Sequence, residues 1–269
     1  MLTAITLTLA ADHDVTLPQN VGRANYAAVL ARLSQVDPTL AAELHDSDGP
    51  KPITCSDLLG ARRNRSGTIL RAGQTADLRF TGLSERVSMA LHACLLEAVP
   101  ETWTLLGQRL PVVRACCQAE IDPRTGSTDY EALASQQLLG EGAPARRAVL
   151  QFDSPTAFKS HGNTVPIPLP GLVFGSLVER WNVFSPVTLS PEMRDYAQEA
   201  VVISRYNLRS LPVVQKNAGL RVGGVGEVTY HALGGDRYWF GVLQMLADFA
   251  KYSGVGVQTA TGMGQCRRI

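Results

Sequence analysis

The chain has 269 residues, of which 45% are hydrophobic and 18% charged, and its net charge at pH 7 is +1. This composition is that of a soluble globular protein with enough apolar residues for one large domain or two of ordinary size. The total charge gives no support for a nucleic-acid partner, and no stretch approaches the roughly 20 apolar residues of a membrane span.

The amino-terminal residues have no basic segment before their apolar part, so we interpret residues 2–10 as a strand and not as a targeting sequence. The five cysteines are odd in number, contain no C-x-x-C pair and lack zinc-ligand spacing: Cys55, Cys94, Cys116, Cys117 and Cys266. We therefore expect a cytoplasmic protein with reduced thiols, no metal and no cofactor.

The first half of the chain predicts an alternation of strands and helices. Asp37 and Pro38 are typical of a helix start, as an N-cap and a first helical residue. The expected strands are residues 2–10, 67–73, 76–82 and 110–121, the second and third of them paired around Gly73, and the expected helices are residues 22–36, 37–45 and 83–99. This order is compatible with the β-α-β-β-α-β plan of a ferredoxin-like domain.

The second half repeats this order after a glycine- and proline-containing linker at residues 139–147. The expected strands are residues 148–155, 200–208 and 223–233, and the expected helices are residues 171–184, 190–200 and 236–252. We therefore predict an α+β fold with tandem ferredoxin-like (RRM-like) domains at residues 1–139 and 140–269. No sequence repeat between the halves supports this beyond the order of elements.

Basic residues gather in two stretches that contain no acidic residue. Either stretch alone is as compatible with a solvated strand face as with a binding site. The two stretches, together with the basic carboxyl terminus, favour a groove for a polyanion. The candidate residues for contacts to such a polyanion are Arg62, Arg63, Arg65, Arg205 and Arg209, and the resemblance described below makes them candidates for RNA binding.

The segment "LHDSDGPKPIT" contains the first candidate for catalysis. His45 ends a predicted helix, and Lys51 follows six residues later across a Gly-Pro loop. An imidazole can gain and lose a proton near neutral pH, and a lysine can stabilise charge on a phosphoryl oxygen. On spacing alone, the simpler interpretation is that His45 lies at a helix carboxyl end and Lys51 is an exposed loop charge. His161, beside a lysine and a glycine, is the second candidate.

The carboxyl-terminal "YSGVGVQTATGMGQCRRI" contains four glycines, namely Gly254, Gly256, Gly262 and Gly264. Gly254 follows a predicted helix, where a glycine cap is common. A dinucleotide fold would require the glycines between a strand and a helix, whereas here they follow a helix and precede the end of the sequence. A loop whose backbone N–H groups bind a polyphosphate or an RNA backbone fits this order better.

Together these segments resemble a known family. The G-x-G pairs separated by five residues, "LHDSDGPKPIT", "LQFDSPTAF", "PIPLPGLVFGSLVERWN" and "VGGVGEVTYHA" are similar, in this order, to a CRISPR-associated endoribonuclease of the RAMP superfamily, which cuts precursor CRISPR RNA within its repeats. The resemblance extends over nearly the whole chain. The joint occurrence of these motifs is more specific for the family than any single motif.

The resemblance implies metal-independent cleavage by the RNA 2′-hydroxyl, which leaves 5′-hydroxyl and 2′,3′-cyclic phosphate ends. It matches His45 and Lys51 to the family's catalytic His and Lys, and it makes Tyr26 the candidate tyrosine, with a core aromatic as the alternative for Tyr26. The partner is CRISPR repeat RNA, and other CRISPR-associated effector subunits or a second copy of the chain are further candidates.

Two other functions remain open from the sequence. A non-catalytic guide-RNA-binding subunit of an effector complex would use the same domains, with His45 and Lys51 as loop residues. A nucleotide-binding regulator with ferredoxin-like domains ranks lower, because no motif is suited to a ribose or a base.

Overall fold

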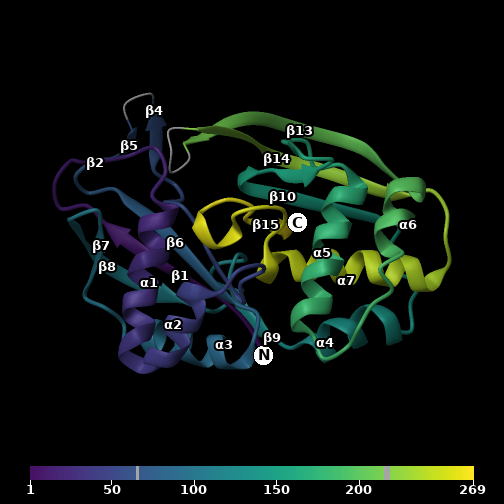
Figure 1. Cartoon of the computed structure of the whole chain (residues 1–269), viewed down its shortest axis with the longest axis horizontal. Coiled ribbons are helices and arrows are strands. Elements are labelled where there is room, and N and C mark those ends of the chain that lie inside the picture. Colours follow the sequence, from purple (N-terminus) through teal and green to yellow (C-terminus); the bar gives the residue numbers. More distant parts are fainter. Residues whose placement is uncertain (65–66, 215–218) are drawn as a thin grey trace. The chain divides into compact units, whose positions relative to one another are not determined.

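The computed structural model describes residues 1–64, 67–214 and 219–269, and it divides into two compact units. The first unit contains Met1–Ser127 and Ala260–Gly262, and the second contains Thr128–Thr259 and Met263–Ile269 (Figure 1). A short segment near the carboxyl end of the sequence therefore belongs to the first unit.

The main sheet of the first unit has the strand order β3-β6-β1-β8-β7, and β9 also pairs with β1. The neighbours along this order are antiparallel. The central strand β1 is buried along most of its length, which explains its nearly continuous apolar sequence. The strands are β1 (Leu2–Ala10), β3 (Ile53–Cys55), β6 (Thr75–Gly82), β7 (Thr102–Leu105), β8 (Gln108–Cys116) and β9 (Gly126–Thr128).

Three helices belong to the first unit, and each begins or packs as the sequence suggests. Asp37 caps α2 by accepting a hydrogen bond from the Leu40 N–H, and Pro38 is the first residue of that helix. Asn25 of α1 is buried and accepts a hydrogen bond from the Trp103 indole N–H. The helices are α1 (Gly22–Val36), α2 (Pro38–Asp46) and α3 (Glu85–His92), the last continued by a π-helical turn, η1 (Ala93–Glu97).

A second, three-stranded sheet of the first unit corrects one prediction. The expected pairing of residues 67–73 with residues 76–82 is wrong, because β5 pairs with β2 and β4 instead. The turn between them exists, with the Gln74 N–H bonded to the Arg71 carbonyl, but both edges of β6 are already occupied by β1 and β3. The three strands are β2 (Val15–Leu17), β4 (Arg62–Asn64) and β5 (Gly67–Leu70).

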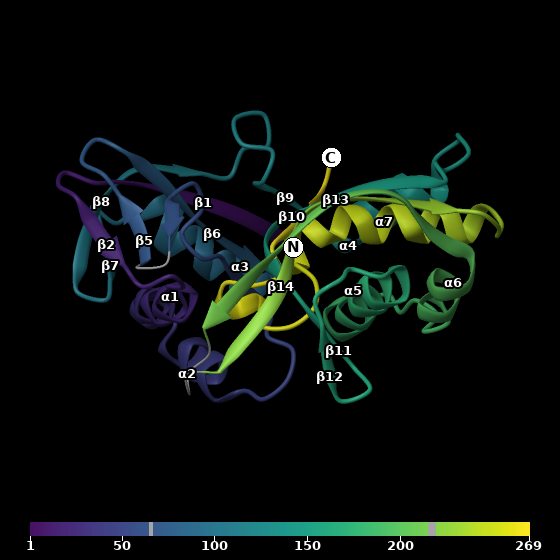
Figure 2. The same ribbon diagram turned by 90° about the horizontal axis from the view of Figure 1, so that it is seen from above.

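The sheet of the second unit has the order β13-β14-β10-β15, again antiparallel throughout. Strands β13 and β14 are paired from Val201↔Ala232 to Val214↔Leu220, so they extend beyond their contact with β10 as a two-stranded ribbon (Figure 2). A small hairpin follows β10. The strands are β10 (Arg147–Thr156), β11 (Phe158–Ser160), β12 (Asn163–Val165), β13 (Val201–Val214), β14 (Leu220–Ala232) and β15 (Cys266–Arg268).

Helices α5 and α7 lie on the same side of this sheet (Figure 1). The Phe174 ring of α5 packs edge-on against Tyr230 of β14, and Gln244 of α7 donates a hydrogen bond to the Arg147 carbonyl of β10. The helical elements are α4 (Tyr130–Ala134), the π-helical η2 (Ser135–Leu139), α5 (Pro170–Phe184), α6 (Met193–Ala200), α7 (Arg237–Ser253) and the short 3₁₀ turn η3 (Thr259–Thr261).

The two main sheets share one topology. In chain order the first unit places its ferredoxin strands as β1, β3, β6 and β8, the second as β10, β13, β14 and β15, and in both the first and third strands are central. The predicted α+β, tandem ferredoxin-like fold is confirmed. Along the sequence, the first unit gives way to the second between Ser127 and Thr128, and not between residues 139 and 140. The reason is that α4 and η2 pack against α7 of the second unit, as the Gln137–Asp248 hydrogen bond shows.

Among the described residues, no helix is both long and apolar enough to cross a membrane. None of the five cysteines, all in that part of the chain, forms a disulfide. The same residues contain no cluster of three or more His, Cys, Asp or Glu side chains suited to a metal ion.

Candidate active site and glycine-rich segment

Two of the three side chains predicted to be catalytic, Tyr26 and Lys51, meet at the carboxyl end of α2. The Tyr26 hydroxyl donates a hydrogen bond of 2.7 Å to the Leu44 carbonyl, and the Lys51 ammonium donates to the same oxygen. The Lys51 Nζ also lies 5.7 Å from the centroid of the Tyr26 ring. The last carbonyls of a helix have no partner within the helix and carry partial negative charge, which explains why both donors gather there. His45 is the next residue.

His45 itself is directed to solvent. Its side chain is 76% exposed, and its Nδ1 lies 2.7 Å from a carboxylate oxygen of the neighbouring Asp46. With the proton on Nδ1, this contact leaves the Nε2 lone pair for proton transfer, an arrangement suited to a general base.

Lys51 is partly buried and fully engaged. Besides the Leu44 carbonyl, its ammonium contacts the Ser47 carbonyl and the Ser47 hydroxyl, each at 3.0 Å. Burial lowers the pKa of Lys51, while the nearby Asp48 and Asp46 carboxylates oppose this shift. An ammonium group has three protons, so a phosphate contact requires the exchange of one of these partners.

Tyr26 is half-buried, and burial raises the pKa of its hydroxyl well above the usual range, with Cys55 as a smaller contribution in the same direction. The group is therefore protonated at neutral pH, and its proton is directed at Leu44. This geometry favours a structural role, in keeping with the core-aromatic alternative for this residue.

The predicted arginines differ in how free they are. Arg62 of β4 and Arg205 and Arg209 of β13 are exposed. Arg63 instead forms an ion pair of 3.2 Å with the buried Asp57, whose side chain is 3% exposed. Arg65 lies outside the described residues. Asp57 lies outside the acid-free stretch that contains Arg63, so counting charges along that stretch could not reveal this ion pair.

All four glycines of the carboxyl-terminal segment have positive φ, between +60° and +103°. Gly254 caps α7, as predicted, with its N–H bonded to the Ala250 carbonyl. The other three also donate their N–H groups within the protein: Gly256 to the Ser176 hydroxyl, Gly262 to the Cys55 carbonyl and Gly264 to the Pro155 carbonyl. The expected cradle of available glycine N–H groups is therefore not found, because each one already has an acceptor.

Close packing explains why glycine is needed here. A Cβ at Gly256 would lie 2.3 Å from the Ala157 carbonyl oxygen, and one at Gly264 would lie 2.2 Å from that of Val255. Both distances are far inside van der Waals contact, and both positions have a backbone conformation that favours glycine. The segment thus owes its glycines to contacts within the protein.

Two residues of α5 hold Gly256 from both sides, and the sequence analysis missed them. The Ser176 hydroxyl accepts from the Gly256 N–H at 2.9 Å, and Arg180, one turn later, donates to the Gly256 carbonyl and to the Thr259 hydroxyl. Arg180 is largely enclosed, and burial lowers its pKa to about 10 although Glu179 opposes the shift. In the sequence, the only indication that Ser176 and Arg180 act together was their i, i+4 spacing on a predicted helix.

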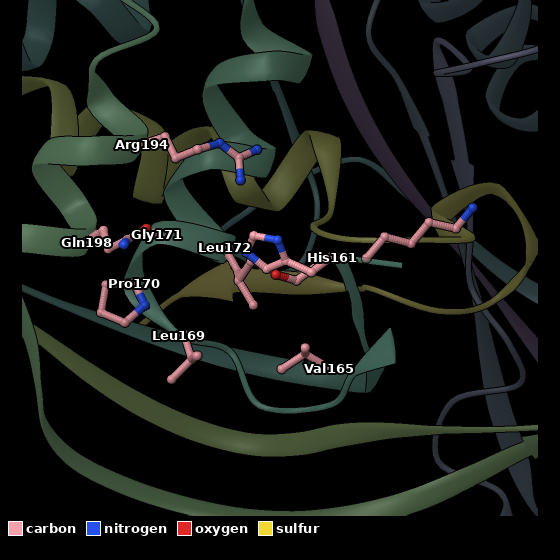
Figure 3. Close-up of a pocket in the computed structure, with 10 residues that line it drawn as sticks. His161, Val165, Leu169, Pro170, Gly171, Leu172, Arg194 and Gln198 are labelled. Atoms are coloured by element: carbon pink, nitrogen blue, oxygen red, sulfur yellow. The ribbon is translucent and has the colours of Figure 1, made fainter. Parts of the chain in front are cut away.

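His161, the second catalytic candidate, lines a pocket of about 710 Å³ in the second unit (Figure 3). Lys159, Arg194 and Gln198 contribute other polar groups, and the amino-terminal residues of α5 form part of the wall. Arg194 is ion-paired with Glu179. Among the described residues the His161 ring has no hydrogen-bond or ion-pair partner that would orient it for proton transfer, so its surroundings favour binding and not catalysis.

Two ferredoxin-like units in tandem, with a glycine-rich carboxyl-terminal segment, place the chain in the class of proteins with paired ferredoxin-like domains, and it is similar to known proteins of this class. Residues 150–266 match the sequence model of the family "CRISPR-associated endoribonuclease Cas6". Curated Cas6 endoribonucleases from Streptococcus thermophilus and Mycobacterium tuberculosis are 30% and 31% identical, over 118 and 124 residues. These alignments cover 42% and 45% of this chain but only 46% and 38% of the relatives, less than half of their length.

Solved structures match over the full length. A Cas6 product complex is 29% identical with a TM-score of 0.81, and the alignment covers 100% of both chains. Thermus thermophilus Cas6 is 27% identical with a TM-score of 0.74, over 100% of this chain and 98% of that one. The predicted relationship to the CRISPR-associated endoribonucleases of the RAMP superfamily is confirmed.

Proposed function

We propose that this protein is a metal-independent endoribonuclease that cleaves precursor CRISPR RNA within its repeats. The observation that carries the proposal is the convergence of Lys51 and Tyr26 on the Leu44 carbonyl, beside the exposed His45. Solved relatives include a product complex and a complex with a substrate mimic, and the similarity of the chain to both supports an RNA substrate.

In the proposed reaction, the 2′-hydroxyl of the RNA attacks the adjacent phosphorus in line with the leaving 5′-oxygen. A base removes the proton of the 2′-hydroxyl and an acid protonates the leaving oxygen, so the products are a 2′,3′-cyclic phosphate and a 5′-hydroxyl. We assign His45 to one of these proton transfers, because its ring is exposed and Asp46 orients Nδ1. One solved relative carries a histidine-to-alanine substitution.

Lys51 supplies positive charge near the phosphate, and Tyr26 positions the turn that carries Leu44 and His45. Exchange of the Ser47 hydroxyl for a phosphate oxygen would keep the Lys51 ammonium saturated. The exposed Arg62, Arg205 and Arg209 are proposed contacts to the RNA backbone, with Arg63 and Arg65 as further candidates. Gly254, Gly256, Gly262 and Gly264 contribute to RNA binding by shaping their segment, and not through their N–H groups.

The test is a single-turnover cleavage assay in EDTA, with repeat RNA encoded by the same genome. His45→Ala is expected to reduce the rate by about 10²- to 10⁴-fold while repeat binding stays within a few-fold of wild type. His13→Ala is the matched control, because His13 is also exposed and its Nδ1 also contacts a neighbouring carboxylate, that of Asp12 at 2.5 Å. The control is expected to cleave at the wild-type rate.

Two results would contradict the proposal. Wild-type cleavage by His45→Ala would remove His45 from the reaction, and a strict requirement for magnesium would exclude unassisted attack by the 2′-hydroxyl. The cleaved ends are identified by 5′-labelling with a kinase: a 5′-hydroxyl is labelled whether alkaline phosphatase is omitted or included, whereas a 5′-phosphate is labelled only after dephosphorylation.

The second candidate function is a non-catalytic RNA-binding subunit. It is favoured by one observation, that every proton of the Lys51 ammonium already has an acceptor within the protein. Under this alternative, wild-type protein binds repeat RNA in EDTA and in magnesium but leaves it uncut in both.

A further inference from the structure

A second pocket of about 370 Å³ lies on the sheet of the second unit, between the β13–β14 ribbon and the segment that leads into α5. Its volume lies near the lower end of the roughly 300–1,000 Å³ of small-molecule sites. The residues on which its chemistry depends are Ile167, Ile203, Tyr206, Leu208, Arg209 and Gly224.

Two large side chains at the border of the pocket are exposed. Tyr206 is 69% exposed and Ile167 is 52% exposed. Among the described residues, the Tyr206 side chain has no hydrogen-bond or ring partner. Gly224 allows the entering segment to approach the sheet, since a Cβ there would lie 2.6 Å from the Pro166 carbonyl oxygen. An apolar floor with an exposed aromatic ring at its border is thus a built feature of this unit.

The charged side chain of the pocket lining is positive. Arg209 belongs to the lining, whereas Arg205 alternates with Tyr206 along β13 and lies on the opposite face of the ribbon. Among the described residues no carboxylate lines the pocket, and the acidic residue of the facing strand, Glu227, is paired in register with Asn207 and lies outside the lining. An apolar protein segment would gain nothing from this arginine, whereas a nucleotide combines a flat apolar base with an anionic phosphate.

We propose that this pocket accepts one unstacked base of a single-stranded RNA segment, with the Tyr206 ring as its stacking partner and Arg209 at the adjacent phosphate. Aromatic stacking and arginine contacts are the usual means by which proteins hold unpaired bases. The inference rests on the proposed function, because it places a base-binding subsite for the same RNA. The assignment extends RNA contact to a tyrosine that charge patterning alone would not select.

The experiment uses repeat RNA with 2-aminopurine placed at one position at a time, and the full-length protein. In wild type, we expect one position, or two adjacent positions, to show fluorescence quenched by stacking. Tyr206→Leu, which keeps the apolar volume but removes the aromatic ring, is expected to restore that fluorescence and to weaken binding by about 5- to 150-fold. Tyr206→Phe retains the ring and is expected to behave as wild type.

Tyr238→Leu is the matched control, because Tyr238 is another exposed tyrosine of the second unit, 43% exposed and located on α7. It is expected to leave both fluorescence and affinity unchanged. Circular dichroism melting of all three variants establishes that each one is folded. If Tyr206→Leu binds with wild-type affinity and quenching persists, the base subsite does not exist.

The outcomes separate this inference from the proposed function. If wild type cleaves the repeat RNA and Tyr206→Leu matches it in binding and quenching, the subsite is rejected and the nuclease proposal stands. If Tyr206-dependent quenching occurs without cleavage, the subsite stands and the nuclease proposal is rejected. If Tyr206→Leu instead changes only the molecular mass in solution, measured by light scattering, the pocket is a protein-docking surface and the inference is overturned.

Discussion

The Leu44 carbonyl is the single atom around which the candidate active site is organised. Two donors far apart in sequence, the Tyr26 hydroxyl and the Lys51 ammonium, meet at it. That Lys51 lies near the carboxyl end of α2 could be predicted from the short Gly-Pro loop between the helix and Lys51. The position of Tyr26 could be narrowed only to the first helix, because which turn of α1 faces the end of α2 depends on packing between the two helices.

Tyr26→Phe separates the two roles that the sequence left open for this residue. We expect the cleavage rate to fall less than tenfold and the free energy of unfolding to decrease by about 1 kcal/mol, because one hydrogen bond to Leu44 is lost while that from Lys51 remains. Single-turnover cleavage and urea unfolding measure the two effects. A rate loss of about 10² or more with unchanged stability would instead make the hydroxyl catalytic.

At the scale of elements, periodicity predicted most of the fold. Strand β1 and helix α1 have the bounds expected from the sequence, and helix α2 begins at its Asp37 cap. The pairing of β5 was not predictable from its turn, because the partner of a strand is decided by which sheet edges remain open. The glycines were correctly recognised as unusual, but their acceptors, such as Ser176 and Cys55, lie far away in sequence.

Ion pairs between elements that are distant in sequence could not be predicted either. Arg124, in the loop after β8, contacts the carboxylates of Asp122 and of Asp77 on β6, and the buried Asp122 also accepts a hydrogen bond from Thr6 on β1. Burial alone would raise the pKa of Asp122, but the hydrogen bonds and charge of Arg124 outweigh it, so the pKa is lowered.

This lowered pKa predicts a pH dependence of stability. In the folded state Asp122 binds fewer protons than in the unfolded state, where its pKa is about 3.9, so its stabilisation is complete above that value and is lost as the pH falls through the folded value. Asp122→Asn is expected to lower the free energy of unfolding at pH 7 by about 1–3 kcal/mol and to reduce its dependence on pH below about 4. Glu141→Gln, in an exposed loop, is the control, and urea unfolding at several pH values is the measurement. An unchanged acid dependence in Asp122→Asn would contradict this account.

At the scale of the whole molecule, the carboxyl-terminal segment serves two units. Ala260–Gly262 belongs to the first unit, where Gly262 forms a parallel bridge with Ser56, while Met263–Ile269 belongs to the second and supplies β15. The sequence predicted two domains divided at one linker, and such a single division cannot describe a segment that changes units within three residues. Glycines occur in this segment because its backbone lies very close to other backbone groups in each of the two units.

Two substitutions two residues apart should therefore act on different units. Gly262→Ala places a Cβ 3.1 Å from the Gly22 Cα, whereas Gly264→Ala places one 2.2 Å from the Val255 carbonyl oxygen, and both add strain at positive φ. In hydrogen–deuterium exchange, we expect the first to increase exchange near residues 55–57 and 20–25, and the second to increase it at Val255 and Val257, whose N–H groups are bonded within the second unit. If both substitutions raise exchange in the same set of amides, the segment is one cooperative element and not two, since amides that open together share one unfolding event.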